Sequence, residues 1–211
     1  ILEAVKLLNR GARIFQPLSI TMFGNSQPPH NEGSRLDPRS PYAIAKASCW
    51  WLCKYYRDEI GLFVSTAIFG NHDSPRRSED YLLHKICNSA VRIARGEQTS
   101  LTLGNINQEV DIGYAKEYVE ASWQILQLDH PDDFVIATGV GLTIRDMVEE
   151  AFRVAGVEGD YKDLVKIDPQ LANTGINAPT YVGNIEKAKR VLGFYPHYTA
   201  KELITLLVKE Y

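Results

Sequence analysis

Apolar and polar positions along the chain follow helical and strand patterns in turn. Residues 62–69, LFVSTAIF, form a short and almost continuous apolar run that predicts a buried strand. Ser40 and Pro41 suit the N-cap and first position of a long helix that runs to about residue 59. Further strands are expected at 13–19, 101–104, 109–113 and 134–138, and further helices at 1–10, 79–95, 116–128, 143–155, 185–192 and from 199 onward.

This alternation of helices and strands argues for an α/β fold with a parallel sheet. A dinucleotide-binding fold of that class normally opens with a strand and a glycine-rich turn, whose backbone N–H groups meet the pyrophosphate. No such turn occurs in the 211 residues; Gly139 and Gly141 come closest, but they lie far downstream and lack a third glycine. Either the chain is incomplete at its amino terminus, or it does not hold a dinucleotide in the usual way.

Composition narrows the class of partner. The chain is 45% hydrophobic and 23% charged, the profile of a soluble globular protein with a sizeable core. A formal net charge of -3 gives no reason to expect nucleic acid or an anionic membrane surface as a partner. No apolar run approaches the roughly 20 residues of a membrane-spanning helix, so no membrane partner is expected.

The three cysteines bear on the cellular compartment and on metal binding. An odd number without a disulfide framework favours a reducing cytosol, so a cytoplasmic location is expected. Cys49 and Cys53 are four residues apart on the long helix, but no cluster of Cys or His completes a metal site. We therefore expect Cys49, Cys53 and Cys87 to be buried free thiols, and we expect no metal.

Tyr42 and Lys46 form a YxxxK pair near the start of the long helix. Side chains at positions i and i+4 share one face of a helix, so the ammonium can lie beside the phenol. A positive charge beside a phenol prepares it to exchange a proton with a substrate hydroxyl. Ser19 and Thr21 lie at the end of a predicted strand, 21–23 residues earlier, where a hydroxyl can bond the same substrate oxygen.

The YxxxK spacing alone is a weak signal, because Tyr81 and Lys85 repeat it. The first pair stands out because it follows a strand and a loop, which is the order that a Ser–Tyr–Lys oxidoreductase site requires. Tyr81 is therefore expected on a solvated helix face.

Six segments carry a more specific pattern. In chain order they are LSITMFG, DPRSPYAIAK, FGNHDSPRR, LTLGNINQEVDIGYAKEYVEA, DFVIATG and KAKRVLGFYP. In these segments and in their order, the chain resembles the GDP-mannose 4,6-dehydratases, a branch of the extended short-chain dehydrogenases/reductases that acts on nucleotide sugars. The combination of PRSPYxxxK with a later NHDSPRR is highly characteristic of that family.

The resemblance implies a partial Rossmann-like parallel sheet with a small carboxy-terminal substrate-binding region. Residues 1–75 are then expected to form the carboxy-terminal part of the dinucleotide-binding domain. Residues 76–211 are expected to be a mixed segment, mainly the nucleotide-sugar-binding region with returning Rossmann elements. The resemblance also implies NADP as cofactor, a GDP-sugar as substrate, and a homo-oligomer or a place in a larger assembly.

The family's reaction assigns roles to the hydroxyl and lysine side chains. NADP takes a hydride from C4 of the mannose, a base removes the C5 proton, water leaves from C6, and the hydride returns to C6. The resemblance implies Tyr42 as the base at the C4 hydroxyl and Lys46 as its ribose-binding partner. Ser19 matches the family's hydroxyl residue, and Thr21 stands where the family has the glutamate that handles the C5 proton.

The remaining matched positions concern binding. The resemblance implies that His72 and Arg77 contact NADP. It places Asn71, Lys85 and Asn105 near the GDP-sugar.

Three departures from the family pattern fall at functional positions. A threonine hydroxyl such as that of Thr21 cannot act as an acid or base near neutral pH. Val110 replaces an arginine that contacts the diphosphate, a charge-assisted contact of roughly 1.5–3 kcal/mol. NTGINAPTY, at 173–181, replaces an Arg-Pro-x-Glu segment that serves the nucleotide.

Two classes of function remain open on these residues. The first is an NADP-dependent GDP-mannose 4,6-dehydratase, a lyase, impaired by the loss of the glutamate; a variant of it keeps only redox chemistry at C4, as a reductase or epimerase. The second is a non-catalytic structural or assembly subunit derived from the family.

The missing glycine-rich turn generates a prediction about cofactor binding. Without that turn, the 211-residue chain alone should bind NADP with a dissociation constant above about 1 mM. Isothermal titration calorimetry measures this directly. Micromolar binding would contradict the prediction and would mean that the chain holds the pyrophosphate at another site.

Overall fold

The computed structural model describes residues 1–171 and 180–211. Its largest sheet is three-stranded and parallel, in the order β1-β2-β7. The central strand β2 (Val64–Phe69) is buried over five of its six residues, as its apolar run predicts. β1 (Ile14–Ser19) and β7 (Asp133–Ile136) flank it. The parallel pairing and the alternation with helices confirm the predicted α/β fold.

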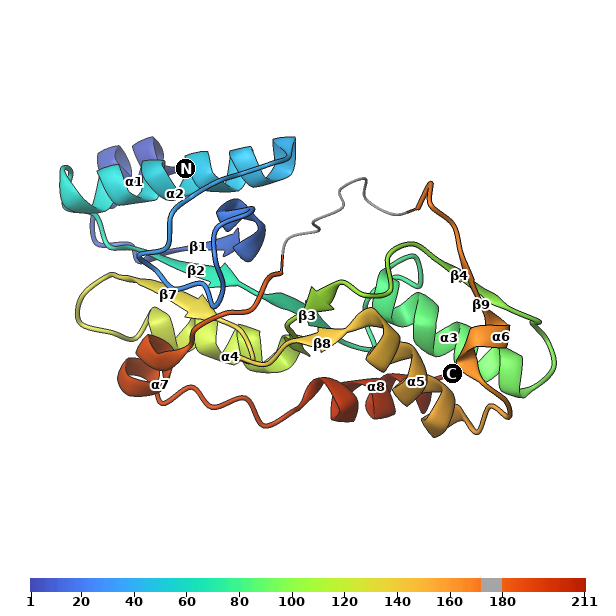
Figure 1. Ribbon diagram of the computed structural model, residues 1–211. Coiled ribbons are helices and arrows are strands. Elements are labelled where there is room, and N and C mark those ends of the chain that lie inside the picture. Colours follow the sequence, from blue (N-terminus) through green and yellow to red (C-terminus); the bar gives the residue numbers. More distant parts are fainter. Residues whose placement is uncertain (172–179) are drawn as a thin grey trace.

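Helices cover both faces of this sheet and form one lobe with it (Figure 1). On one face lies α2 (Pro41–Asp58), beside α1 (Leu2–Leu8). The other face is covered by α4 (Ala115–Ile125) and α7 (Glu186–Leu192). The long helix α2 begins where the sequence predicts, because Ser40 Oγ accepts a hydrogen bond from the Ala43 N–H and proline occupies the first helical position.

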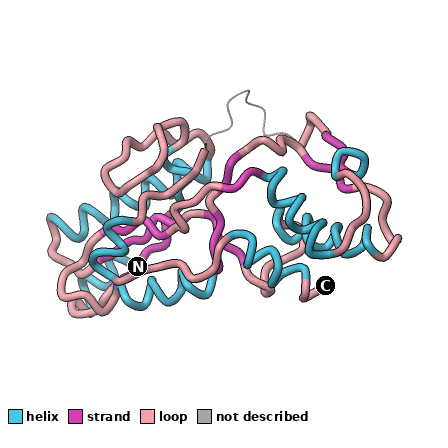
Figure 2. Tube along the Cα trace, turned by 60° about the horizontal axis from the view of Figure 1, so that its bottom comes forward, coloured by secondary structure: helices cyan, strands magenta, loops and turns pink. Residues whose placement is uncertain are grey.

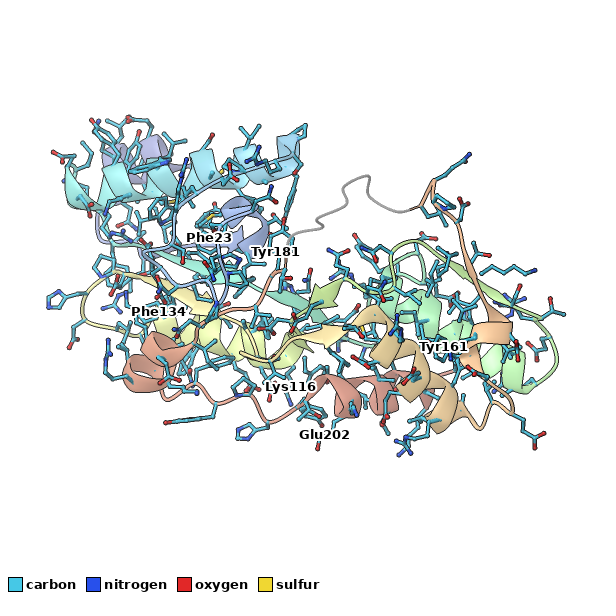
Figure 3. All side chains as sticks on the ribbon, in the orientation of Figure 1. Phe23, Lys116, Phe134, Tyr161, Tyr181 and Glu202 are labelled. Carbon is cyan, nitrogen blue, oxygen red and sulfur yellow. The ribbon has the colours of Figure 1, made fainter. Side chains whose placement is uncertain are left out.

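A second lobe is mainly helical and has its own apolar core (Figures 1 and 3). Thr143 and Thr199 begin two of its helices with capping boxes, which satisfy backbone N–H groups at each helix start. A short parallel pair of strands lies at its edge. The elements of this lobe are α3 (Leu82–Ala94), α5 (Ile144–Ala155), α6 (Tyr161–Leu164), α8 (Ala200–Val208), β4 (Leu101–Leu103) and β9 (Val165–Ile167).

Short strands connect the two lobes, as both the ribbon and the turned view show (Figures 1 and 2). One parallel pair joins β3 to β6, and one antiparallel pair joins β5 to β8. These strands have only two or three residues, too few for a side-chain period to be visible in the sequence. Their bounds are β3 (Asn71–Asp73), β5 (Glu109–Val110), β6 (Ile112–Tyr114) and β8 (Leu142–Thr143), and a 3-10 helix, η1 (Ile20–Phe23), follows β1.

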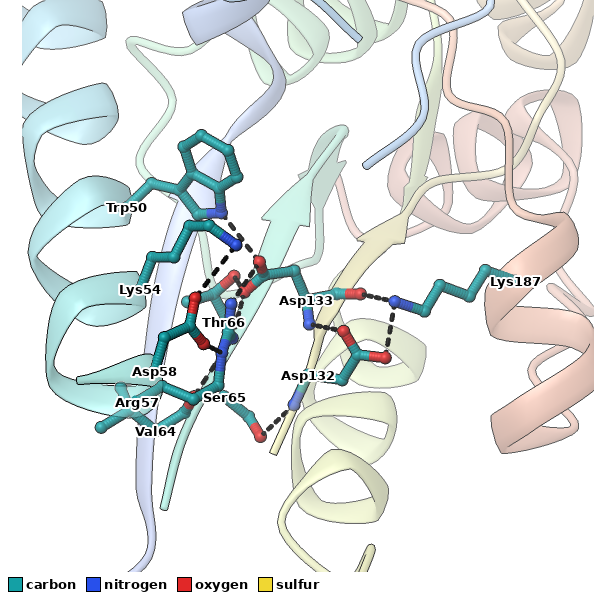
Figure 4. A network of polar contacts seen from close by, with 10 residues as sticks. All are labelled: Trp50, Lys54, Arg57, Asp58, Val64, Ser65, Thr66, Asp132, Asp133 and Lys187. Carbon is teal, nitrogen blue, oxygen red and sulfur yellow. Dashed lines mark hydrogen bonds and ion pairs between the residues drawn. The ribbon is translucent and has the colours of Figure 1, made fainter. Parts of the chain in front are cut away.

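A buried polar network fixes α2 to the sheet (Figure 4). Arg57 donates to both carboxylate oxygens of Asp133, over 2.7 and 2.8 Å. Thr66 Oγ1 and Trp50 Nε1 donate to the same carboxylate, over 2.7 and 3.0 Å. Burial by itself would raise the pKa of Asp133, but the bonds from Arg57, Thr66 and Trp50 together hold that pKa below its usual value. The carboxylate thus links α2, β2 and β7 at one point.

This network generates a stability prediction. Asp133→Asn removes the bidentate carboxylate partner of the buried Arg57 and leaves it only the half-exposed Asp58 carboxylate and the Val64 carbonyl, so we expect a loss of about 3 kcal/mol in the free energy of unfolding. Urea denaturation at pH 7 measures it. Because the pKa of Asp133 is lowered in the folded chain, the difference between the two proteins should shrink as the pH falls below about 4.

The matched control is Lys54→Ala, which removes an exposed ion pair with Asp58 on the same helix. That substitution should change the free energy of unfolding by no more than about 0.5 kcal/mol. Equal effects of the two substitutions would contradict the proposed importance of the buried carboxylate.

The outer face of α2 carries an exposed apolar stripe. Ile44, Trp51, Leu52 and Tyr55 recur at helical spacing, and each side chain is more than half exposed. In addition, no strand of the described residues pairs with the outer edge of β1. In the part of the chain that is described, no helix has the length and apolar character that a bilayer crossing requires. Exposed apolar stripes and free strand edges favour association with other protein surfaces.

We therefore predict that the isolated chain is not a monodisperse monomer. Trp51→Glu should shift it toward the monomer, because it places a charge within the stripe. Val119→Glu is the matched control, since Val119 is an exposed apolar residue on α4. Light scattering that reports a stable species of 23.7 kDa for the unmodified chain would contradict this prediction.

Candidate functional site

A cavity of about 340 Å³ lies where the two lobes meet. It opens at the carboxyl ends of β1 and β2, the edge at which ligands bind in parallel α/β sheets. α2 contributes to one wall, and β5, β6, α3 and α5 contribute apolar residues to the others. The polar side chains that line the cavity are Ser19, Thr21, Tyr42, Asn71, His72, Asp73, Arg77, Tyr81, Gln108 and Tyr181.

Two hydroxyl groups meet at the end of β1. Ser19 Oγ and Thr21 Oγ1 are 2.9 Å apart, and Ser19 Oγ also accepts a hydrogen bond from the Thr21 N–H as it begins η1. η1 is followed by Gly24. The φ of Gly24 is +54°, and a side chain there would collide with the Asp37 carbonyl, so only glycine fits. The predicted Ser19–Thr21 hydroxyl pair therefore lies in the cavity, held by local backbone geometry.

Tyr42 reaches the same cavity from the first turn of α2. Its side chain is 57% exposed, so the phenol is open to a ligand. The Lys46 ammonium lies 5.7 Å from the centre of the Tyr42 ring, and it donates a hydrogen bond to the Pro17 carbonyl of β1 over 2.9 Å. The structure thus places Tyr42 and Lys46 side by side, but Lys46 is not among the residues that line the cavity.

The NHDSPRR loop forms another side of the cavity. His72 Nδ1 lies 3.0 Å from the Gly70 carbonyl, which can only accept, so Nδ1 carries a proton. Burial lowers the pKa of His72. Arg77 donates to the His72 carbonyl over 2.9 Å, and its guanidinium stacks on the Tyr81 ring at 3.6 Å. Arg77 Nε is buried and makes no hydrogen bond within the described residues.

Two of the predicted binding residues lie elsewhere. Lys85 Nζ donates to the Thr102 carbonyl over 2.8 Å and borders a separate hollow of about 400 Å³ between α3 and β4. Asn105 follows β4, and its side chain accepts a hydrogen bond from the Asn107 N–H. Tyr81 was expected only on a solvated helix face. Half of its surface is exposed, but it also lines the main cavity.

Sequence reasoning did not identify Asp73, Gln108 and Tyr181 as lining residues. No local pattern indicates Asp73, because β3 has only three residues, too few for a side-chain alternation to be read in the sequence. Tyr181 lies next to His30, which is fully buried and stacks on Phe23; Figure 3 labels Tyr181 and Phe23. No local pattern links Tyr181 to these residues, because the contact spans about 150 positions of the chain.

Val110, which the resemblance matches to an arginine of the family, also lines the cavity. Most of the segment 173–181 lies outside the described residues. Among residues 1–171 and 180–211, no group of three His, Cys, Asp or Glu side chains could hold a metal ion.

The family model for GDP-mannose 4,6 dehydratase matches residues 1–207. The chain belongs to the GDP-mannose 4,6-dehydratase family. A GDP-mannose 4,6 dehydratase of Arabidopsis thaliana is 38% identical over the whole of this chain, and one of Vibrio cholerae is 34% identical. The match covers 57% and 64% of those two relatives, so the chain spans about three fifths of their length.

Solved structures show the same fold. RMD from Pseudomonas aeruginosa, complexed with NADPH, superposes with a TM-score of 0.87 over 99% of this chain and 69% of its own, at 20% identity. A dTDP-glucose 4,6-dehydratase of Bacillus anthracis, in complex with NAD, gives a TM-score of 0.85 at 22% identity, over 100% of this chain and 64% of its own. The chain therefore has the Rossmann-type α/β fold of these structures.

Proposed function

We propose that this chain is the sugar-binding and proton-transferring part of an NADP-dependent enzyme that acts on GDP-mannose, with weakened dehydration. The observation that carries the proposal is the convergence of Ser19, Thr21 and Tyr42 on one cavity between the lobes. These hydroxyls come from separate elements and lie at the edge of the sheet where a sugar ring can reach all of them. We also propose a cytoplasmic location, supported by three free cysteines.

The cavity residues fit the nicotinamide-ribose end of NADP. Arg77 supports this fit, because its buried Nε has no partner in the described residues and an anionic or carbonyl oxygen would satisfy it. His72 and Tyr42 lie on the same cavity, and Lys46 lies directly behind Tyr42. When bound, NADP supplies the acceptor for a hydride from C4 of the sugar.

The chain's own residues then handle protons at C4. Tyr42 takes the proton of the C4 hydroxyl, and Lys46 lies beside it as a positive charge. Ser19 donates a hydrogen bond to the same sugar oxygen, since its hydroxyl lies at the cavity wall and its partner Thr21 can accept or donate. The product at this stage is a 4-keto sugar.

Dehydration requires a second proton transfer, from C5. Thr21 occupies the position of the family's glutamate and cannot accept that proton at neutral pH. Val110 adds an apolar surface where a diphosphate contact is expected. These two positions favour C4 redox chemistry, as in a reductase or epimerase, as the second candidate function. A purely structural subunit is the third, and the exposed stripe on α2 is the feature that supports it.

The test puts back the family's glutamate at position 21 and its arginine at position 110. In a full-length form with a complete cofactor-binding half, Thr21→Glu with Val110→Arg should increase formation of the 4-keto-6-deoxy product at least about 100-fold, because general acid–base catalysis typically contributes 10²–10⁴. The measurement is the conversion of GDP-mannose with NADP, followed by NMR. Adding Tyr42→Phe to the double variant is the control and should abolish the gain.

Robust turnover by the unmodified protein would contradict the weakened dehydration. Absence of product from both proteins would favour the structural subunit over the enzyme.

A further inference from the structure

Asp73 is the one carboxylate among the described residues that line the cavity. It ends β3 and is 4% exposed. Its Oδ1 accepts a hydrogen bond from the Ser74 N–H over 2.9 Å, whereas no hydrogen bond from the described residues reaches Oδ2. One oxygen is therefore fixed by the backbone, and the other remains a potential proton acceptor.

His84 supports this carboxylate from the core of the helical lobe. Its Nε2 lies 2.9 Å from the Ser74 carbonyl and 3.3 Å from Asp73 Oδ1. Because a carbonyl only accepts, Nε2 carries a proton and directs it toward both oxygens. Nδ1 lies 2.6 Å from the Tyr211 hydroxyl, so both ring nitrogens are used. With 2% of its surface exposed, His84 is a positioning residue that does not reach the cavity.

The surroundings also suit proton transfer. Burial raises the pKa of Asp73, while the Ser74 N–H, His84 and Arg77 oppose the rise. A carboxyl group with a raised pKa is a stronger base than an exposed one and can act as acid or base closer to neutral pH.

We propose that Asp73 is a catalytic carboxylate that removes the C5 proton of a 4-keto GDP-sugar, the step that Thr21 cannot perform, whereas the water that departs from C6 still lacks the acid that a glutamate at position 21 would supply. This inference rests on the proposed function, since it requires the GDP-sugar to occupy the cavity. The C5–H bond breaks, its electron pair forms the C4–C5 double bond, and the C4 oxygen becomes an enolate. Asp73 holds the proton, and the hydroxyls of Tyr42 and Ser19 donate to the enolate oxygen. Reversal returns a proton to C5.

The reversible step can be tested without a cofactor, because the ketone is already present in GDP-4-keto-6-deoxymannose. The 211-residue chain is mixed with this sugar nucleotide in D₂O, and NMR follows deuterium entry at C5. Unmodified protein should accelerate exchange over the protein-free rate, and Asp73→Asn should lower that acceleration at least about 100-fold. Ligand-observed NMR should show binding changed by less than about threefold, since Asn keeps an acceptor for the Ser74 N–H.

Glu117→Gln is the matched control. Glu117 is also a buried carboxylate that accepts backbone N–H groups, from His197 and Tyr198, but it lies outside the cavity. Exchange should be unchanged in this variant. Unmodified protein that does not bind the sugar nucleotide overturns both the proposed function and this inference, whereas binding without accelerated exchange overturns the inference alone.

A rescue separates catalysis from structure. Thr21→Glu added to Asp73→Asn should restore exchange, because a carboxylate returns to the cavity from another element. Exchange that survives Asp73→Asn, or that is lost without rescue in a folded protein, overturns the inference.

If Asp73→Asn does not fold, the pH dependence of C5 exchange by the unmodified protein tests the inference instead. Among the described residues, the charged or titratable groups near Asp73 are His72, Arg77, His84, Cys87 and Tyr211. Exchange that rises with one ionisation above about pH 3.9, the value for an exposed Asp, supports the inference. A flat profile overturns it.

Discussion

The bidentate contact between Arg57 and Asp133 is the constraint on which the site depends. It joins the carboxyl-terminal turn of α2 to β2 and β7, and Thr66 and Trp50 donate further hydrogen bonds to the same carboxylate. A buried ion pair contributes most to structure when every hydrogen-bonding group around it is satisfied, as it is here. α2 carries Tyr42 at its other end, so this contact helps to hold against the sheet the helix from which the phenol reaches the cavity.

The cavity exists because two cores with different architectures meet at short strands. The parallel sheet supplies hydroxyls at the ends of β1 and η1, and the helical lobe supplies apolar side chains from α3 and α5. β3 runs between them and brings Asn71, His72 and Asp73 to the boundary. The polar side chains of the cavity are therefore held mainly by the sheet lobe and β3, and they face apolar side chains of the helical lobe.

Much of the fold could be predicted from the sequence, because the long elements carry clear signals. Ser40–Pro41 marks the start of α2, and the apolar run at 62–69 marks β2. The hydroxyl, tyrosine, histidine and arginine residues of the cavity could also be predicted, from the order of the motifs along the chain. Asp73 and Tyr181 were not, because their direction depends on strand pairing and on contacts between distant segments. The same limit explains why the sequence did not show that Lys85 lies away from the cavity, on the side of α3 that borders the separate hollow.

Family membership is established, and the proposed chemistry at C4 rests on the residues that meet in the cavity. The most direct test is a crystal structure of the chain with a GDP-sugar bound. We expect the sugar ring in the cavity, with its C4 oxygen within about 3.2 Å of both the Tyr42 and the Ser19 hydroxyl oxygens. A sugar ring bound elsewhere, with Tyr42 and Ser19 making no contact to it, would contradict the proposed function.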